Sequence, residues 1–225
     1  MEGYSSLAFP VLIRKVYLWM TLALAITGVT AYGVANSPNL LQFLHSSYWV
    51  FFGVVLGELG LVMWLSAAIN RLSLQTATLL YLVYSVLNGA VLSMIFVAYS
   101  PLVITKVFLI TAGTFGAMAF IGYTTKRDLS KMGSILYMAL IGLIIASVVN
   151  IFLRSSGFDL ILSYLGVAIF VGLSAWDVQK IKVMLSEQEY ADESAQKMAL
   201  IGALTLYLDF INLFLYLLRI FGRER

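Results

Sequence analysis

Long apolar runs separated by short polar breaks recur along the whole chain. A helix needs about 20 apolar residues to cross roughly 30 Å of hydrocarbon, and seven runs reach that length. They cover residues 16–35, 48–69, 76–99, 103–124, 132–153, 159–181 and 198–221. The pattern predicts an all-α polytopic membrane protein with seven transmembrane helices, which we expect to form a single domain over residues 1–225.

The breaks between the runs carry turn residues, as in "ANSPN" (35–39), "NRLS" (70–73) and "RSSG" (154–157). Only "SEQEYADESAQK" (186–197) is long and acidic enough to be a solvated loop. Small residues recur every four positions on three runs, which favours close helix packing in lipid. These are Ser85, Gly89 and Ser93, then Ala112 and Gly116, then Gly142 and Ala146.

Composition supports a membrane protein, because 61% of the residues are hydrophobic and only 11% are charged. In soluble domains about half of the residues are hydrophobic and about a quarter are charged. The absence of cysteine excludes disulfides, thiol catalysis and cysteine-ligated metals. The one histidine, His45, falls in a short polar connection, so no histidine cluster can bind a metal. We expect no cofactor. The net charge of +3 does not indicate nucleic-acid binding, because the basic residues lie at the ends of spans.

Lysine and arginine positions favour a cytoplasmic N-terminus with seven spans and an outside C-terminus. In that orientation Arg14, Lys15, Arg71, Lys126, Arg127, Lys131, Lys180, Lys182 and Lys197 face inward, and Lys106, Arg154, Arg219, Arg223 and Arg225 face outward. The alternative is six spans with a re-entrant last segment, which would place the basic tail inside.

Three acidic residues lie inside apolar runs: Glu58 in "LGELGLVMWL", Asp177 in "GLSAWDVQKI" and Asp209 in "LTLYLDFINLFL". An aspartate at the centre of a membrane helix costs about 2.5–3.5 kcal/mol on insertion scales. Such residues face the protein interior, pair with other groups and mark functional sites.

Whether Asp177 and Asp209 meet depends on where the sixth span ends. If it ends near Ile181, the two depths differ by about 10 Å, at about 1.5 Å per helical residue. Extension to Leu185 reduces the difference to about 4–5 Å, which tilt and side-chain length can bridge. The sequence leaves both possibilities open.

Polar residues form a stripe on the last span, where Thr205, Asp209, Asn212 and Tyr216 follow one another at helical spacing. A polar stripe of this kind points toward protein or a wet cavity. Arg71, at the inner end of the second span, is a candidate counter-charge for Asp177.

Two carboxylates in a poorly hydrated site cannot both ionise easily, so they titrate as a unit. One shared proton would bridge the two helices, and its loss would add repulsion. The pair is therefore a candidate proton sensor. Its ionised oxygens also suit transient binding of a hard cation such as calcium. The pair is too poor in ligands for a calcium buffer, so a permeation or gating role fits better.

Three segments resemble the Bax inhibitor family, also called the transmembrane Bax inhibitor motif family. They are "GYTTKRDLS" (122–130), "FVGLSAWDVQKI" (170–181) and "GALTLYLDFINLFLYLLRIFG" (202–222), in the family's order. The resemblance is strongest to the bacterial inner-membrane branch. It implies a seven-helix fold with the C-terminal helix at its centre, and a pH-sensitive calcium leak.

The family's di-aspartyl sensor corresponds to Asp177 and Asp209, and its acidic residue on the second helix corresponds to Glu58. The family's basic latch on that helix corresponds less closely to Arg71, because Ile69 occupies the nearer position. The resemblance also places the protein in a bacterial inner membrane, with the lipid bilayer, calcium ions and protons as its partners.

Two other functions remain open from the sequence. A non-transporting modulator would bind stress-response or quality-control membrane proteins through the acidic loop 186–197. An intramembrane aspartyl protease would also use two aspartates on adjacent helices as acid and base. That enzyme class has a Gly-x-Gly-Asp motif, whereas this chain has "AWD" and "LYLD". We therefore expect the protein not to be an enzyme.

Overall fold

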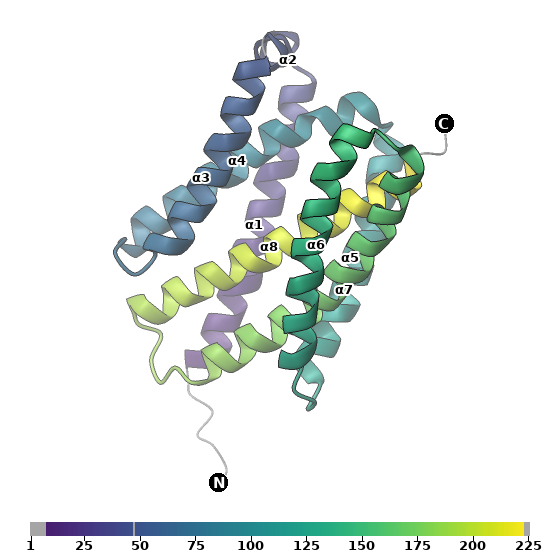
Figure 1. Ribbon diagram of the computed structural model, residues 1–225. Coiled ribbons are helices and arrows are strands. Elements are labelled where there is room, and N and C mark those ends of the chain that lie inside the picture. The colour runs from purple at the N-terminus through teal and green to yellow at the C-terminus, as the bar shows by residue number, and fades with distance from the viewer. Residues whose placement is uncertain (1–7, 47, 223–225) are drawn as a thin grey trace. The chain divides into compact units, whose positions relative to one another are not determined.

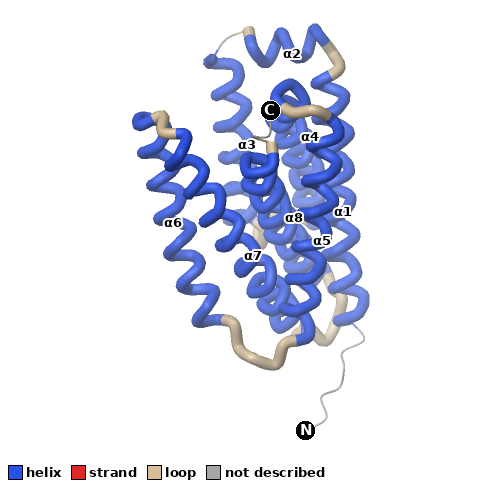
Figure 2. Tube along the Cα trace, turned by 90° about the vertical axis from the view of Figure 1, so that its right-hand side faces the viewer, coloured by secondary structure: helices blue, strands red, loops and turns tan. Residues whose placement is uncertain are grey.

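A computed structural model describes residues 8–46 and 48–222, and that part of the chain is helical and contains no strand (Figure 2). The eight helices labelled in Figure 1 are α1 (Ala8–Ala35), α2 (Pro38–His45), α3 (Tyr48–Ala68), α4 (Leu74–Ala98), α5 (Pro101–Thr124), α6 (Ser130–Leu153), α7 (Ser156–Ser186) and α8 (Glu193–Phe221). All except α2 are long and apolar enough to span a membrane, which confirms the predicted fold class. Arg223 and Arg225 lie outside the described residues.

Helices α1 and α7 extend beyond the spans predicted from their apolar runs. Helix α1 begins eight residues before its apolar run, because Ala8, Leu12 and Val16 recur at four-residue spacing and are all buried. Helix α7 continues to Ser186, past Ile181. Packing against protein therefore extends helices beyond the length that hydrocarbon alone requires.

Residues 38–45 form the short helix α2, where the sequence analysis placed only a polar connection containing His45. Proline at its start has the backbone angle that a first helical turn needs, and Ser37 precedes it in an extended conformation. Eight residues are too few for hydrophobic periodicity to reveal a helix.

The chain divides into two compact units. The first contains the described residues up to Ser100 together with Leu185–Tyr207, and the second contains Pro101–Met184 and the residues from Leu208 onward. Helix α8 is continuous and contributes to both units. It also has the largest buried share of the seven spans, 67% of its most apolar stretch against 44% for α7, and its central position stays a prediction. A single domain over the whole chain stays a prediction.

In the first unit, α1 and α3 both pack against α4. Gly89 permits the α1 contact, because a Cβ there would lie 2.6 Å from the Thr27 carbonyl oxygen. Ser85 and Ser93, its neighbours at four-residue spacing, are fully buried. The small-residue stripe predicted on this span therefore lies at a helix contact.

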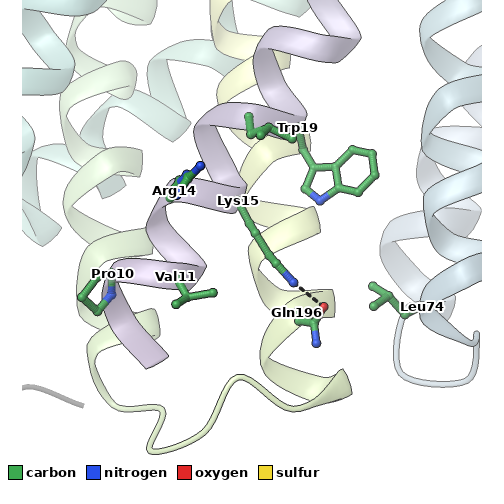
Figure 3. Close-up of a pocket in the computed structure, with 8 residues that line it drawn as sticks. Pro10, Val11, Arg14, Lys15, Trp19, Leu74 and Gln196 are labelled. Carbon is green, nitrogen blue, oxygen red and sulfur yellow. Dashed lines mark hydrogen bonds between the residues drawn. The ribbon is translucent and has the colours of Figure 1, made fainter. Parts of the chain in front are cut away.

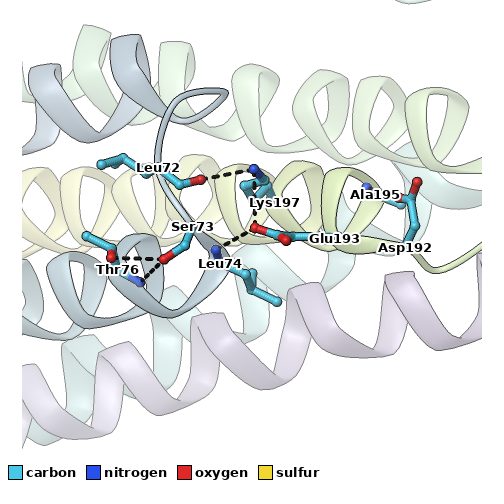
Figure 4. A network of polar contacts seen from close by, with 8 residues as sticks. All are labelled: Leu72, Ser73, Leu74, Thr76, Asp192, Glu193, Ala195 and Lys197. Carbon is cyan, nitrogen blue, oxygen red and sulfur yellow. Dashed lines mark hydrogen bonds and ion pairs between the residues drawn. The ribbon is translucent and has the colours of Figure 1, made fainter.

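The start of α8 is attached to the turn between α3 and α4, within the first unit (Figure 4). The Glu193 carboxylate accepts a hydrogen bond from the Leu74 N–H at 2.9 Å, and Lys197 donates to the Leu72 carbonyl at 3.0 Å. Asp192 caps α8 by accepting from the Ala195 N–H at 2.8 Å. These bonds fix the first turn of the helix that later presents Asp209.

In the second unit, three glycines allow α7 to approach its neighbours. A Cβ on Gly122 of α5 would lie 2.1 Å from the Ala175 carbonyl oxygen, and one on Gly133 of α6 would meet the Trp176 ring at 2.2 Å. On α7, Gly172 leaves room for the Leu136 side chain of α6, because an added Cβ would lie 2.6 Å from Leu136 Cδ1. The segment of α7 that carries Asp177 is therefore closely packed from two sides.

Candidate functional site

Asp177 of α7 and Asp209 of α8 meet inside the second unit. Their side chains are 2% and 5% exposed, and they lie within hydrogen-bonding reach of each other. The structure has the longer α7, past Ile181, and this is the case in which contact was expected. The geometry brings the two residues together, and their role as a proton sensor stays a prediction.

A hydrogen bond between two carboxyl groups requires a proton on one of them, because ionised carboxylates only accept. Asp209 Oδ2 is buried and receives no hydrogen bond from any described N–H or O–H group. A carboxyl proton shared with Asp177 would supply the missing donor. The arrangement therefore favours a pair that holds one proton between two helices.

Lys180 is the cation whose charge acts on Asp177, and the sequence analysis did not single it out for this role. It lies three residues further along α7, and its ammonium group lies 5.0 Å from the centre of the Trp176 ring. The charges of Asp177 and Asp209 also act on Tyr137 of α6, whose ring meets Trp176 edge-on at 5.3 Å. Its three-residue spacing from Asp177 on one helix is the sequence signal that could have found it.

Two of the segments that carry the family resemblance contact each other beside the pair. Gln179 of α7 accepts from the Leu129 N–H at 2.9 Å and donates to the Arg127 carbonyl at 2.8 Å. Lys182 donates to the Tyr123 carbonyl at 2.7 Å. The segment 122–130 is thus attached to the helix that carries Asp177.

A second buried acid, Glu58 of α3, lies in the first unit and is 8% exposed. It accepts hydrogen bonds from the Asn88 amide and from Tyr84, both on α4. The Asn88 side-chain oxygen Oδ1 accepts in turn from the Tyr207 hydroxyl of α8 at 2.9 Å. The Tyr207 oxygen also lies 2.7 Å from the Thr27 hydroxyl of α1. We call these five residues the Glu58 network.

Proton accounting shows that the Glu58 network has alternative hydrogen-bond arrangements. Thr27 is placed to donate to the Ser85 carbonyl at 2.9 Å, Tyr207 is placed to donate to Asn88, and the two hydroxyls also face each other. Two hydroxyl protons therefore serve three contacts, and only two can be made at once. The network can redistribute its hydrogen bonds without moving a helix.

Arg71 is exposed in the turn after α3, and in the described chain no ion pair joins it to Glu58, whose bonds go to α4. Its latch role and its predicted action as a counter-charge for Asp177 stay predictions.

The remaining stripe residues form contacts of their own. Thr205 and Asn212 bond to carbonyls one turn earlier in α8, at 3.1 and 2.8 Å. The Tyr216 ring stacks on Phe170, with centroids 5.9 Å apart. Asp209 is thus the stripe residue that bonds to another acidic side chain.

Among the described residues, no three acidic or histidine side chains gather into a metal site. The Asp177–Asp209 pair therefore offers carboxylate oxygens from two residues only. Six to eight oxygen ligands are usual for tightly bound calcium. This geometry suits passing contact with a cation rather than retention.

Comparison with known proteins gives consistent matches over nearly the whole chain. A family model described as "Inhibitor of apoptosis-promoting Bax1" matches residues 10–225. Inner membrane protein YbhL of Escherichia coli strain K12 is 48% identical over 212 residues, covering 94% of this chain and 91% of that protein. An uncharacterized protein of Borreliella burgdorferi is 47% identical over 213 residues, covering 95% and 92%. Uncharacterized protein RP147 of Rickettsia prowazekii is 44% identical over 213 residues, covering 94% and 89%.

Proposed function

Because the chain belongs to the Bax inhibitor family, we propose that this multi-pass membrane protein is a pH-sensitive leak channel or exchanger for cations, with calcium as the transported ion. Protonation of Asp177 and Asp209 would gate it. The observation that carries the proposal is the contact between these two buried carboxyl groups on adjacent helices. We also propose a bacterial inner membrane as its location, with the N-terminus in the cytoplasm.

The closed state holds one proton between the two carboxyl groups. A hydrogen bond from a carboxylic acid to a carboxylate is short and about twice as strong as a neutral one. It therefore joins α7 to α8 most firmly when the pair carries a single negative charge.

Loss of the shared proton leaves two like charges in contact. Two unit charges 4 Å apart repel by about 4 kcal/mol at an effective dielectric constant of 20. A difference of that size shifts an equilibrium between closed and open helix arrangements by about 1,000-fold. The protonation state of one pair is thus sufficient to act as a gate.

The direction of the pH response follows from this accounting. Raising the pH removes the shared proton and opens the pair by repulsion. Lowering the pH far enough adds a second proton and leaves only the weaker neutral hydrogen bond. Flux should therefore be lowest in the pH range where the pair holds one proton, and should rise on either side of it.

Calcium is the proposed cargo because its preferred ligands are oxygens, and ionised carboxylates provide them. The ion would bind transiently to the pair after deprotonation, and Glu58 provides a further buried carboxyl group in the first unit. The pair's small ligand set favours release, which conduction requires.

The proposal is tested with the purified protein in sealed liposomes that contain a fluorescent calcium indicator. We expect calcium entry above that of protein-free liposomes, with a minimum along the pH axis. Magnesium is the comparison ion, because it dehydrates reluctantly and should enter more slowly. Calcium entry equal to that of protein-free liposomes at every pH would exclude transport, and would leave the non-transporting modulator as the function to pursue.

A further inference from the structure

A cavity of about 590 Å³ lies within the first unit, between the beginning of α1, the first residue of α4 and the first turn of α8 (Figure 3). Its walls carry two basic residues, Arg14 and Lys15, and one amide, Gln196. The other five lining residues are apolar: Pro10, Val11, Leu18, Trp19 and Leu74. Its volume is in the usual range of pockets that bind small molecules.

The basic residues of this cavity are free of acidic partners in the described chain. Arg14 is exposed, and the ion pairs of that part of the chain involve neither Arg14 nor Lys15. Lys15 donates to the Gln196 side-chain amide oxygen at 2.6 Å, which orients its ammonium group without neutralising it (Figure 3). Gln196 is itself held by a bond from its amide nitrogen to the Ala191 carbonyl at 2.9 Å.

Glu193, the acidic residue three positions before Gln196 on α8, already has partners of its own. Glu193 accepts from the Leu74 N–H at 2.9 Å and pairs with Lys197 at 3.5 Å. Among the described residues, no acidic side chain therefore pairs with Arg14 or Lys15, and the bond to Gln196 orients the Lys15 ammonium group. An anion is the ligand that this electrostatic arrangement fits.

The position of the cavity along α1 corresponds to the membrane surface. Arg14 and Lys15 directly precede the 20-residue run 16–35, which is the length that crosses the hydrocarbon. Trp19 follows Lys15 by one turn, about 6 Å further along the helix. Tryptophan is enriched at the boundary between headgroups and acyl chains. The basic residues therefore lie at the level of lipid phosphates.

We infer that this cavity binds the headgroup of an anionic phospholipid, with its phosphate on Arg14 and Lys15 and an acyl chain along Leu18 and Trp19. A guanidinium group can bind phosphate through two parallel hydrogen bonds. Basic pockets between transmembrane helices are established sites for anionic headgroups. The apolar majority of the lining favours a lipid over free phosphate, because a soluble anion would leave those side chains without a partner.

The test is native mass spectrometry of the full-length protein in detergent, titrated with phosphatidylglycerol, phosphatidylcholine or inorganic phosphate. The wild type should bind phosphatidylglycerol at least about 10-fold more tightly than phosphatidylcholine. The double variant Arg14→Gln/Lys15→Gln should bind phosphatidylglycerol about 30-fold more weakly, because each basic residue near the surface contributes about a factor of five. The conservative variant Arg14→Lys/Lys15→Arg should keep most of the affinity.

The matched control is Lys126→Gln/Arg127→Gln, which removes two adjacent exposed cations from the loop between α5 and α6. It should bind phosphatidylglycerol as the wild type does. If the double variant does not fold, Arg14→Gln alone should still weaken binding about five-fold. Three results would overturn the inference: equal binding of both lipids, equal loss in the control, or displacement of phosphatidylglycerol by millimolar inorganic phosphate.

Discussion

Tyr207 joins three helices of the first unit through a single hydroxyl group, which lies between Thr27 of α1 and Asn88 of α4. The Tyr207→Phe substitution keeps the ring contacts with Tyr81 and Tyr84 but leaves the buried side-chain oxygen Oδ1 of Asn88 without its donor. An unsatisfied buried acceptor costs about 1–3 kcal/mol. We expect the free energy of unfolding, measured by denaturant titration in mixed micelles, to fall by that amount.

Tyr190→Phe is the control for this substitution, because Tyr190 is 76% exposed in the loop before α8. Its free energy of unfolding should change by less than about 0.5 kcal/mol. Equal stability of the Tyr207→Phe protein and the wild type would show that the Glu58 network does not depend on this hydroxyl.

Lys180 provides a second prediction at the scale of one residue. Its positive charge acts on Asp177, so its removal should change the pH profile of calcium flux. In Lys180→Gln, the pH at which calcium flux is lowest should differ from that of the wild type by a few tenths of a pH unit, the size expected from an exposed charge pair on a helix. Lys182→Gln loses a bond to the Tyr123 carbonyl and should leave the pH profile of calcium flux unchanged. A flux minimum at the same pH in Lys180→Gln and in the wild type would contradict an action of this charge on the pair.

The sequence identified the buried acids but not the groups that surround them. Asp177, Asp209 and Glu58 were recognisable because a charged residue within an apolar span is costly and therefore informative. Tyr137 and Gln179 gave no comparable signal, because polar aromatic and amide side chains are common near span ends. Their positions beside the pair depend on helix packing, which no local pattern specifies.

At the scale of helices, the contact between α5 and α7 depends on one glycine. In Gly122→Ala, the new Cβ would lie 2.1 Å from the Ala175 carbonyl oxygen, so one helix must move. Overpacking of this kind costs about 1–3 kcal/mol. We expect a lower free energy of unfolding and an altered pH profile of flux, because Ala175 is two residues before Asp177.

Gly113→Ala on the same helix is the matched control. A Cβ there meets nothing within 4 Å, and alanine is favoured over glycine in a helix by about 1 kcal/mol. The Gly113→Ala protein should be at least as stable as the wild type. If the two substitutions had the same effect, close packing at Gly122 would not be what positions α7.

The number and order of the seven membrane-length helices were predictable because each span must be long enough to cross hydrocarbon, whereas the short helix α2 was not. Helix contacts were predictable only in part. The stripe around Gly89 does pack closely, whereas a Cβ on Gly116 or Gly142 would meet nothing within 4 Å. Four-residue spacing of small residues identifies a smooth helix face, but does not say whether another helix of the chain covers it.

For the whole molecule, the proposed orientation gives a direct prediction. The chain has no cysteine, so single cysteines can be introduced and labelled with a membrane-impermeant maleimide in intact cells. Asn39→Cys, before α3, and Gly222→Cys, after α8, should label, and Glu187→Cys, between α7 and α8, should not. A Gly222→Cys protein that stays unlabelled while Asn39→Cys labels would favour the re-entrant last segment.

We propose that proton sharing between Asp177 and Asp209 controls cation flux. The most direct test is calcium flux across a pH series in liposomes, comparing the wild type with Asp177→Asn/Asp209→Asn. Two asparagines can still form a hydrogen bond, but neither ionises in this range. Asp128→Asn, in the loop before α6, is the control. We predict a flux minimum along the pH axis in the wild type and control, and a flat profile in the double variant. An unchanged pH profile in the double variant would show that the two aspartates do not control the flux.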